Sequence, residues 1–275
     1  MAVTNAVETT MVWGTVSGAS MGGMVVSLLL SVGLPVFLCI FIYKKTKAWV
    51  PAFFIGCGIF VGFAMILEQI LHAIVLALTG SVLQDNIWLY GIYGGLAAAL
   101  FEETGRWIAM KFCLKKHLTR ENALMYGAGH GGIEAFLILG LSSMSNLLTA
   151  AMINGGLMEK TMTALEPAQQ ELTYHQLSVL WTTPAYQFYL APVERISAIA
   201  LQIALSILVF SAVKTGKKLH LAAAFGLHFA VDFLTVVCAS VIPTWVLELG
   251  LLVVVAVICA AVYKLVYVPL AEKKA

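Results

Sequence analysis

The sequence predicts an all-α membrane protein, a polytopic bundle of about seven transmembrane helices. Of its 275 residues, 61% are hydrophobic and only 11% are charged, whereas soluble domains are nearer ~45–50% apolar and about 25% charged. The apolar residues form long unbroken runs, unlike the alternating pattern of an outer-membrane barrel. This composition excludes a soluble globular domain, a disordered chain and a nucleic-acid-binding protein.

Seven segments reach the ~20 apolar residues that a membrane-crossing helix needs. They are residues 18–43, 50–78, 87–114, 122–151, 186–213, 219–241 and 245–267. The only long loop on the outer side is expected at 157–185, and it is either an amphipathic surface helix or an ordinary connection. No repeat or linker divides the chain, so we expect one integral-membrane domain over residues 1–275.

The basic residues predict the orientation. Most of the 16 lysines and arginines follow the first, third, fifth or seventh segment, whereas Lys160 is the one basic residue in a loop of the opposite side. Cytoplasmic loops are enriched in lysine and arginine. We therefore expect the N-terminus outside, the C-terminus inside, and a bacterial-type plasma membrane as the location.

Ionisable side chains occur inside three of the segments. They are Glu102, Glu103 and Arg106 in the third, His130 and Glu134 in the fourth, and His228 and Asp232 in the sixth. Charges inside a span cost at least ~2.5–3.5 kcal/mol each on insertion scales, so they usually face the bundle interior and serve function. The i,i+3 and i,i+4 spacings put each group on one helix face. With a rise of 1.5 Å per residue, all three groups lie roughly 12 Å inside the cytoplasmic boundary, which predicts one shared site.

A second polar layer is expected nearer the outer surface. It comprises Glu68, His72, Glu194 and Arg195. We interpret this layer as mainly structural, with Arg195 paired to Glu68 or to another nearby acid.

Carboxylates and imidazoles on facing helices can bind a divalent metal, most often zinc. The candidate ligands are His130, Glu134, His228 and Asp232. Glu103 or Glu102 would then take a proton from a water that the metal acidifies. The same groups can act without metal if a glutamate held ionised by Arg106 activates water directly and the histidines hold the water or the oxyanion. Both routes are hydrolysis.

The order of these motifs resembles the CPBP superfamily of CAAX proteases and bacteriocin-processing intramembrane metalloproteases, which is related to PrsW and to a gamma-secretase subunit. The string HGGIEAF and the seven-span layout are most similar to its YhfC family of membrane peptidases. The resemblance covers a catalytic core at about 87–241. It implies that the paired glutamates activate water, with a basic partner and three further site residues: Glu102, Glu103, Arg106, Glu134, His228 and Asp232.

The sequence therefore favours a membrane-embedded peptidase that acts on a membrane protein or peptide in the cytoplasmic half of the bilayer. Two alternatives stay open: a non-catalytic scaffold or immunity-type protein of the same fold, and a proton or cation transporter. Transport is disfavoured because the polar groups cluster at one depth and no inverted repeat is visible. The five cysteines have no metal-type spacing, so we interpret them as small buried hydrophobes.

Overall fold

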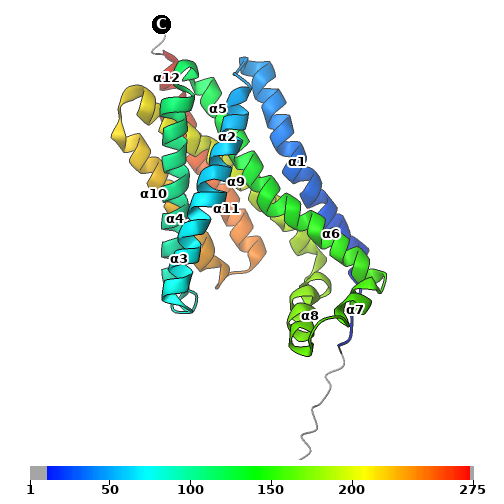
Figure 1. The fold of residues 1–275 in the computed structure, drawn as a ribbon. Helices are drawn as coiled ribbons and strands as arrows, with labels where there is room; N and C mark the ends of the chain where they lie inside the picture. The colour runs from blue at the N-terminus through cyan, green and yellow to red at the C-terminus, as the bar shows by residue number, and fades with distance from the viewer. Residues whose placement is uncertain (1–10, 273–275) are drawn as a thin grey trace, which may run out of the picture.

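A computed structural model describes residues 11–272, and the described chain is an all-α bundle (Figure 1). The α-helices are α1 (Gly18–Thr46), α2 (Pro51–Phe60), α3 (Gln69–Thr79), α4 (Ile87–Ile108), α5 (Arg120–Ala135), α6 (Leu141–Asn154), α7 (Leu157–Met162), α8 (Pro167–Thr182), α9 (Ala185–Thr215), α10 (Lys218–Ala239), α11 (Thr244–Val262) and α12 (Pro269–Glu272). The π-helical segments are η1 (Val61–Glu68), η2 (Ala109–Cys113), η4 (Phe136–Gly140) and η5 (Tyr263–Tyr267), and η3 (Lys115–His117) is a 3-10 turn. The predicted fold class is confirmed.

Within the described residues, 6 helices are long and apolar enough to cross a membrane. They are Gly18–Thr46, Pro51–Thr79, Arg120–Asn154, Ala185–Thr215, Lys218–Ala239 and Thr244–Tyr267. Each coincides with a predicted span to within a few residues. The remaining predicted span forms helix α4, but it is not among the six. Its two glutamates, Glu102 and Glu103, and its glycines lower its hydropathy, so the count of seven and the orientation stay predictions.

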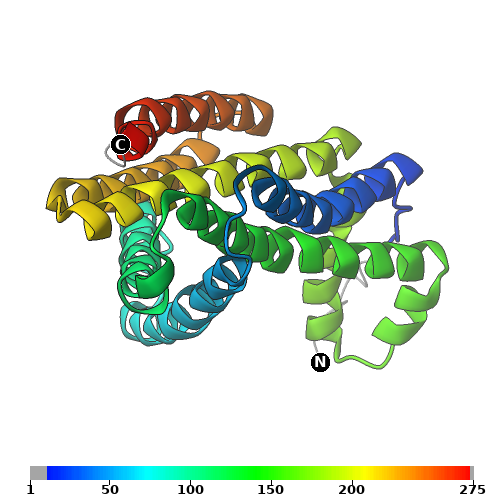
Figure 2. The same cartoon turned by 90° about the horizontal axis from the view of Figure 1, so that it is seen from above.

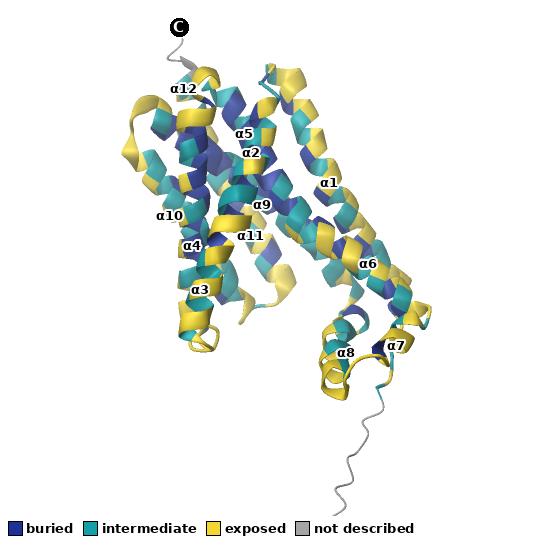
Figure 3. Cartoon of the chain, viewed as in Figure 1, coloured by how far each residue is buried: buried dark blue, intermediate teal, exposed yellow. Residues whose placement is uncertain are grey.

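Helix α9 is the centre of the bundle. In its most apolar stretch 72% of the residues are buried, against 17–22% in the other five helices. A helix that is apolar all round is buried among others. In Figure 2, α9 lies between α11 on one side and α5 and α1 on the other, and Figure 3 shows the buried residues concentrated on these inner elements. A side chain on α9 can therefore reach several neighbouring helices.

Glycines on α5 let its neighbours approach at backbone distance. A Cβ atom on Gly129 would lie 1.9 Å from the carbonyl oxygen of Phe53 in α2. One on Gly127 would lie 2.7 Å from the Cα atom of Ile203 in α9. Small residues of this kind allow close packing of membrane helices. Helix α5 is thus clamped between α2 and α9, and His130, which follows Gly129 directly, is fully buried.

Three π-helical segments border ionisable residues. Segment η1 ends at Glu68, η2 begins shortly after Arg106, and η4 begins shortly after Glu134. A π-helical turn inserts residues into the α-helical repeat and so changes which face a helix presents further along the chain. The sequence analysis did not predict these segments.

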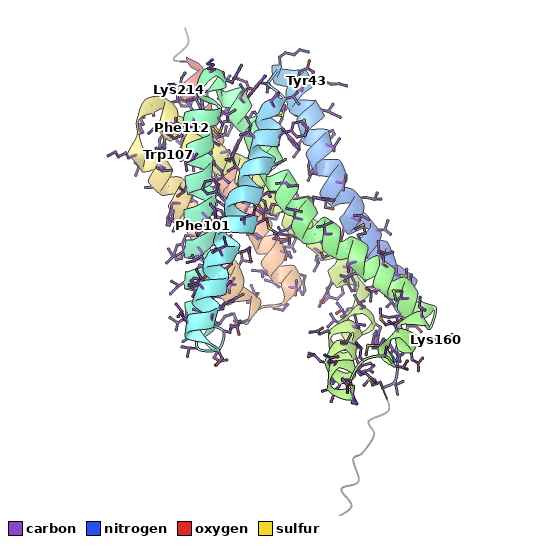
Figure 4. All side chains as sticks on the ribbon, viewed as in Figure 1. Tyr43, Phe101, Trp107, Phe112, Lys160 and Lys214 are labelled. Carbon is purple, nitrogen blue, oxygen red and sulfur yellow. The ribbon has the colours of Figure 1, made fainter. Side chains whose placement is uncertain are left out.

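The expected outer loop 157–185 contains helices α7 and α8. They lie at the end of the molecule near Lys160, opposite Lys214 (Figure 4). The chain before α1 packs here, because the ring of Trp13 lies 5.7 Å from that of Trp181 in α8. The Val16 amide also donates to Asn154 Oδ1 at 2.8 Å. The start of the described chain is thereby fastened to this end of the bundle.

Candidate active site

The structure brings the predicted inner residues into one buried cluster. Helix α4 supplies Glu102, Glu103 and Arg106, α5 supplies His130 and Glu134, and α10 supplies His228. All of these side chains are buried, and Arg106 and His130 are 0% exposed. Asp232 on α10 borders the cluster with a side chain that is 35% exposed.

Glu102 lies at the centre of the cluster and is contacted from three other helices as well as its own. His130 Nε2 lies 2.8 Å from Glu102 Oε2, and Gln202 Nε2 donates to the same oxygen at 2.9 Å. His228 Nε2 and Arg106 Nη2 lie 3.9 Å and 4.0 Å from it. Among residues 11–272, the hydrogen bonds to this carboxylate all go to Oε2. Its Oε1 therefore stays available to accept from a water.

Glu103 has a different role, because it fixes its neighbours. Its Oε1 accepts from Arg106 Nη1 at 2.7 Å and lies 2.8 Å from His228 Nδ1. The other nitrogen of His228, Nε2, then lies 3.5 Å from Asp232 Oδ2. A carboxylate behind a histidine sets the orientation of the ring and the nitrogen that it presents. Glu103 is 2% exposed.

Glu134 is held by residues of α9. Its Oε1 accepts from Arg195 Nη1 at 3.1 Å, and Arg195 also pairs with Glu194. The sequence analysis expected Arg195 and Glu194 in a separate outer layer. They instead line the same cavity as Glu134, because the long arginine side chain reaches from α9 to α5.

The other half of that predicted layer is a distinct pair. His72 Nε2 lies 3.2 Å from Glu68 Oε1, one helical turn away. His72 Nδ1 lies 2.7 Å from the Tyr93 hydroxyl of α4. Neither Glu68 nor His72 lines the cavity bordered by the main cluster.

Gln202 on α9 is the residue that sequence reasoning missed. Its Nε2 donates at 2.9 Å to both Glu102 and Glu134, and its Oε1 accepts from Arg106. One buried neutral amide thus connects an arginine with two carboxylates. Its only sequence signal was a glutamine within the apolar run of the fifth predicted span.

The cluster borders a cavity of about 280 Å³. Its polar lining includes Glu102, Glu134, Asp232, Arg195, Gln202 and His228, and its apolar lining includes Leu201, Val231 and Val255. A water occupies about 30 Å³ in the liquid, so the volume admits several waters. The lining thus combines charged groups that can act on a substrate with side chains that suit apolar atoms. Glu103 lines no part of this cavity.

The residues around this cavity are of types that bind divalent cations, but their side chains are not arranged as a metal site. Within residues 11–272, no three His, Cys, Asp or Glu side chains form a ready metal-binding group. The chemistry nevertheless fits: His228 Nε2, Asp232 and Glu102 meet at the cavity, and the His228 ring is supported by Glu103 as metal-bound histidines usually are. His130 fits less well, because its Nε2 faces Glu102 and its buried Nδ1 has no described partner.

Comparison with known proteins identifies the family of this chain. The model of the YhfC intramembrane metalloprotease family matches residues 29–259. The chain is 43% identical over 204 residues to the uncharacterized membrane protein YhfC of Bacillus subtilis (strain 168), covering 71% of this chain and 76% of that protein. No solved structure matches the chain. The resemblance inferred from the motifs is confirmed: this integral membrane protein belongs to the YhfC intramembrane metalloprotease family.

Proposed function

We propose that this protein is a membrane-embedded peptidase of the bacterial plasma membrane that hydrolyses a peptide bond in a membrane protein or membrane-bound peptide. The observation that carries the proposal is a connected cluster of three glutamates, two histidines, two arginines and a glutamine from four helices, part of which lines a cavity. Burying so many charged groups is unfavourable unless they are paired and serve function. The family assignment supports the same reaction class.

Glu102 is the candidate general base. It lines the cavity, its Oε2 is fixed by His130 and Gln202, and its Oε1 is available to a water. A carboxylate within hydrogen-bond reach can take a proton from the water as its oxygen attacks the peptide carbonyl carbon. Returning that proton to the departing amine nitrogen completes the hydrolysis.

Glu103 and Arg106 are positioning residues in this scheme. Arg106 Nη1 donates to Glu103 Oε1 at 2.7 Å, and Glu103 in turn orients His228. Arg195 lines the cavity and is the candidate donor to the negative oxygen that develops on the scissile carbonyl. Donors fixed before the reaction stabilise that charge without reorganisation.

We further propose that His228 and Asp232 hold a divalent cation beside Glu102, and this donor set favours zinc. A bound cation would supply Lewis acidity to a water in the cavity. Elemental analysis of the purified protein tests this without an activity assay. A stoichiometric metal in the wild type that is lost in His228→Ala supports the assignment, and a metal-free wild type after purification without chelators contradicts it.

The reaction is tested by sequencing new protein termini in membranes from cells that express the chain. Wild type should generate membrane-protein termini that are missing when Glu102→Gln is expressed at the same level. Glu68→Gln is the matched control, because it neutralises a buried glutamate that does not line the cavity. Identical sets of termini from wild type and Glu102→Gln would overturn the proposal.

A further inference from the structure

A second cavity lies at the end of the bundle where the basic residues gather. It has a volume of about 610 Å³ and is lined by Lys115, Lys116, Arg120 and Lys214, which come from η3, α5 and α9. The one acidic side chain in its lining, Glu121, accepts from Arg120 Nε at 2.9 Å. The pocket therefore carries a surplus of positive charge and suits an anion.

An apolar groove begins next to this pocket. Its volume is about 470 Å³, and its lining includes Leu124, Ile203, Ile207, Val262 and Tyr263. Leu124 is one helical turn from Arg120 along α5, and Ile207 is two turns from Lys214 along α9. The groove therefore lies further along the same two helices than the basic pocket.

Arg120 and Tyr267 stand at the junction of the two spaces. Arg120 lines the basic pocket and Tyr267 lines the groove. Arg120 Nη1 donates to the Tyr267 carbonyl oxygen at 3.2 Å, and its guanidinium carbon lies 4.5 Å from the centre of the Tyr267 ring. The junction is thus a fixed contact between the ends of α5 and η5, with charge on one side and apolar surface on the other.

We propose that this composite site binds an anionic phospholipid, with the phosphate in the basic pocket and an acyl chain in the groove. Basic pockets between membrane helices at the cytoplasmic boundary suit anionic headgroups. The adjoining groove favours a lipid over a soluble phosphate, because only a lipid fills both spaces. The site is separate from the candidate active site, so it does not depend on peptidase activity.

The test uses the full-length protein in detergent and measures binding of phosphatidylglycerol by native mass spectrometry. The pocket variant is Lys115→Gln/Lys116→Gln/Lys214→Gln. The matched control is Lys44→Gln/Lys45→Gln/Lys47→Gln, which removes the same charge from exposed residues at the same end of the bundle. We expect the pocket variant to lose about tenfold or more in affinity and the control to change by less than about twofold. Equal losses in the two variants would overturn the proposal.

The second arm separates the lipid from its headgroup. Glycerol phosphate has the charge but no acyl chain, so it should bind roughly tenfold or more weakly than phosphatidylglycerol. Phosphatidylcholine should also bind more weakly, because its choline cation opposes the lysines. Displacement of phosphatidylglycerol by millimolar inorganic phosphate, or equal affinity for phosphatidylcholine, would contradict an anionic lipid site.

Discussion

Two glutamate–histidine pairs show what separates a candidate catalytic group from a structural one. Glu68 and His72 lie one turn apart in the same membrane-spanning helix and contact each other, and His72 also contacts the Tyr93 hydroxyl of α4. Glu102 and His130 come from different helices and meet further partners from α9 and α10 at a cavity. Both are acid–imidazole pairs inside predicted spans, so residue type alone does not distinguish them. What distinguishes the two pairs is that residues from several helices meet around Glu102 at one cavity.

The largest expected effect of a substitution in these pairs is on catalysis. Glu102→Gln removes the candidate base while keeping its shape, and we expect peptide cleavage to fall by about 10²–10⁴-fold. Glu68→Gln should keep activity within about twofold of wild type, because it lines no part of the cavity. Initial rates on a substrate identified from the new termini measure both. Similar losses in the two variants would mean that the two pairs do not differ in role.

The next effect is on stability. Arg106→Gln would leave Glu103 as a buried carboxylate without its arginine, which is 0% exposed. Breaking a buried ion pair from one side typically costs about 3–5 kcal/mol. Unfolding in mixed micelles by a denaturing detergent measures this loss. Glu103→Gln/Arg106→Gln removes both charges and should therefore be more stable than Arg106→Gln. If the double variant were the less stable of the two, the unpaired Glu103 carboxylate would not be the cause of the loss in Arg106→Gln.

A smaller effect is expected where α5 packs on α2. Gly129→Ala places a methyl group 1.9 Å from the Phe53 carbonyl oxygen, and relief of such overpacking typically costs about 1–3 kcal/mol. Gly58→Ala on α2 is the control, because its Cβ meets nothing within 4 Å. Its unfolding free energy should stay within about 1 kcal/mol of wild type. Equal stability of the two variants in the same assay would show that this contact does not clamp α5.

The smallest effect is expected at the Glu68–His72 pair. His72→Phe keeps an aromatic ring near Tyr93 but removes the contacts to Glu68 and to the Tyr93 hydroxyl. The side chain is 25% exposed, so we expect a loss of only about 0.5–1.5 kcal/mol and unchanged cleavage. The same unfolding assay, run beside the activity assay, checks both. Loss of cleavage in a stably folded His72→Phe would assign this pair to the active site.

The sequence predicted the fold and the composition of the cluster better than its connections. Spacing along each helix and depth in the membrane were enough to expect that Glu102, His130 and His228 meet. The pairing of Arg195 with Glu134 depends on how α9 crosses α5, which no spacing within one helix reports. Gln202 is neutral, so a search for ionisable groups passed over it although it contacts two of the carboxylates.

Two further features could not be predicted from the local sequence pattern. The π-helical segments arise from packing between helices and leave no periodic signal in a uniformly apolar run. Helices α7 and α8 form in a stretch rich in polar residues, where alternation of apolar and polar positions was too weak to choose between a helix and an irregular loop. Both features lie where tertiary contacts, rather than the local pattern, determine the structure.

The most direct test of the central claim is cleavage by the purified protein in proteoliposomes that contain one defined substrate and no other protease. If the cluster around Glu102 hydrolyses peptide bonds, the wild type will release the product, and Glu102→Gln, reconstituted at the same density, will not. Equal product formation by the two proteins would contradict the account, because the chemistry would then lie elsewhere.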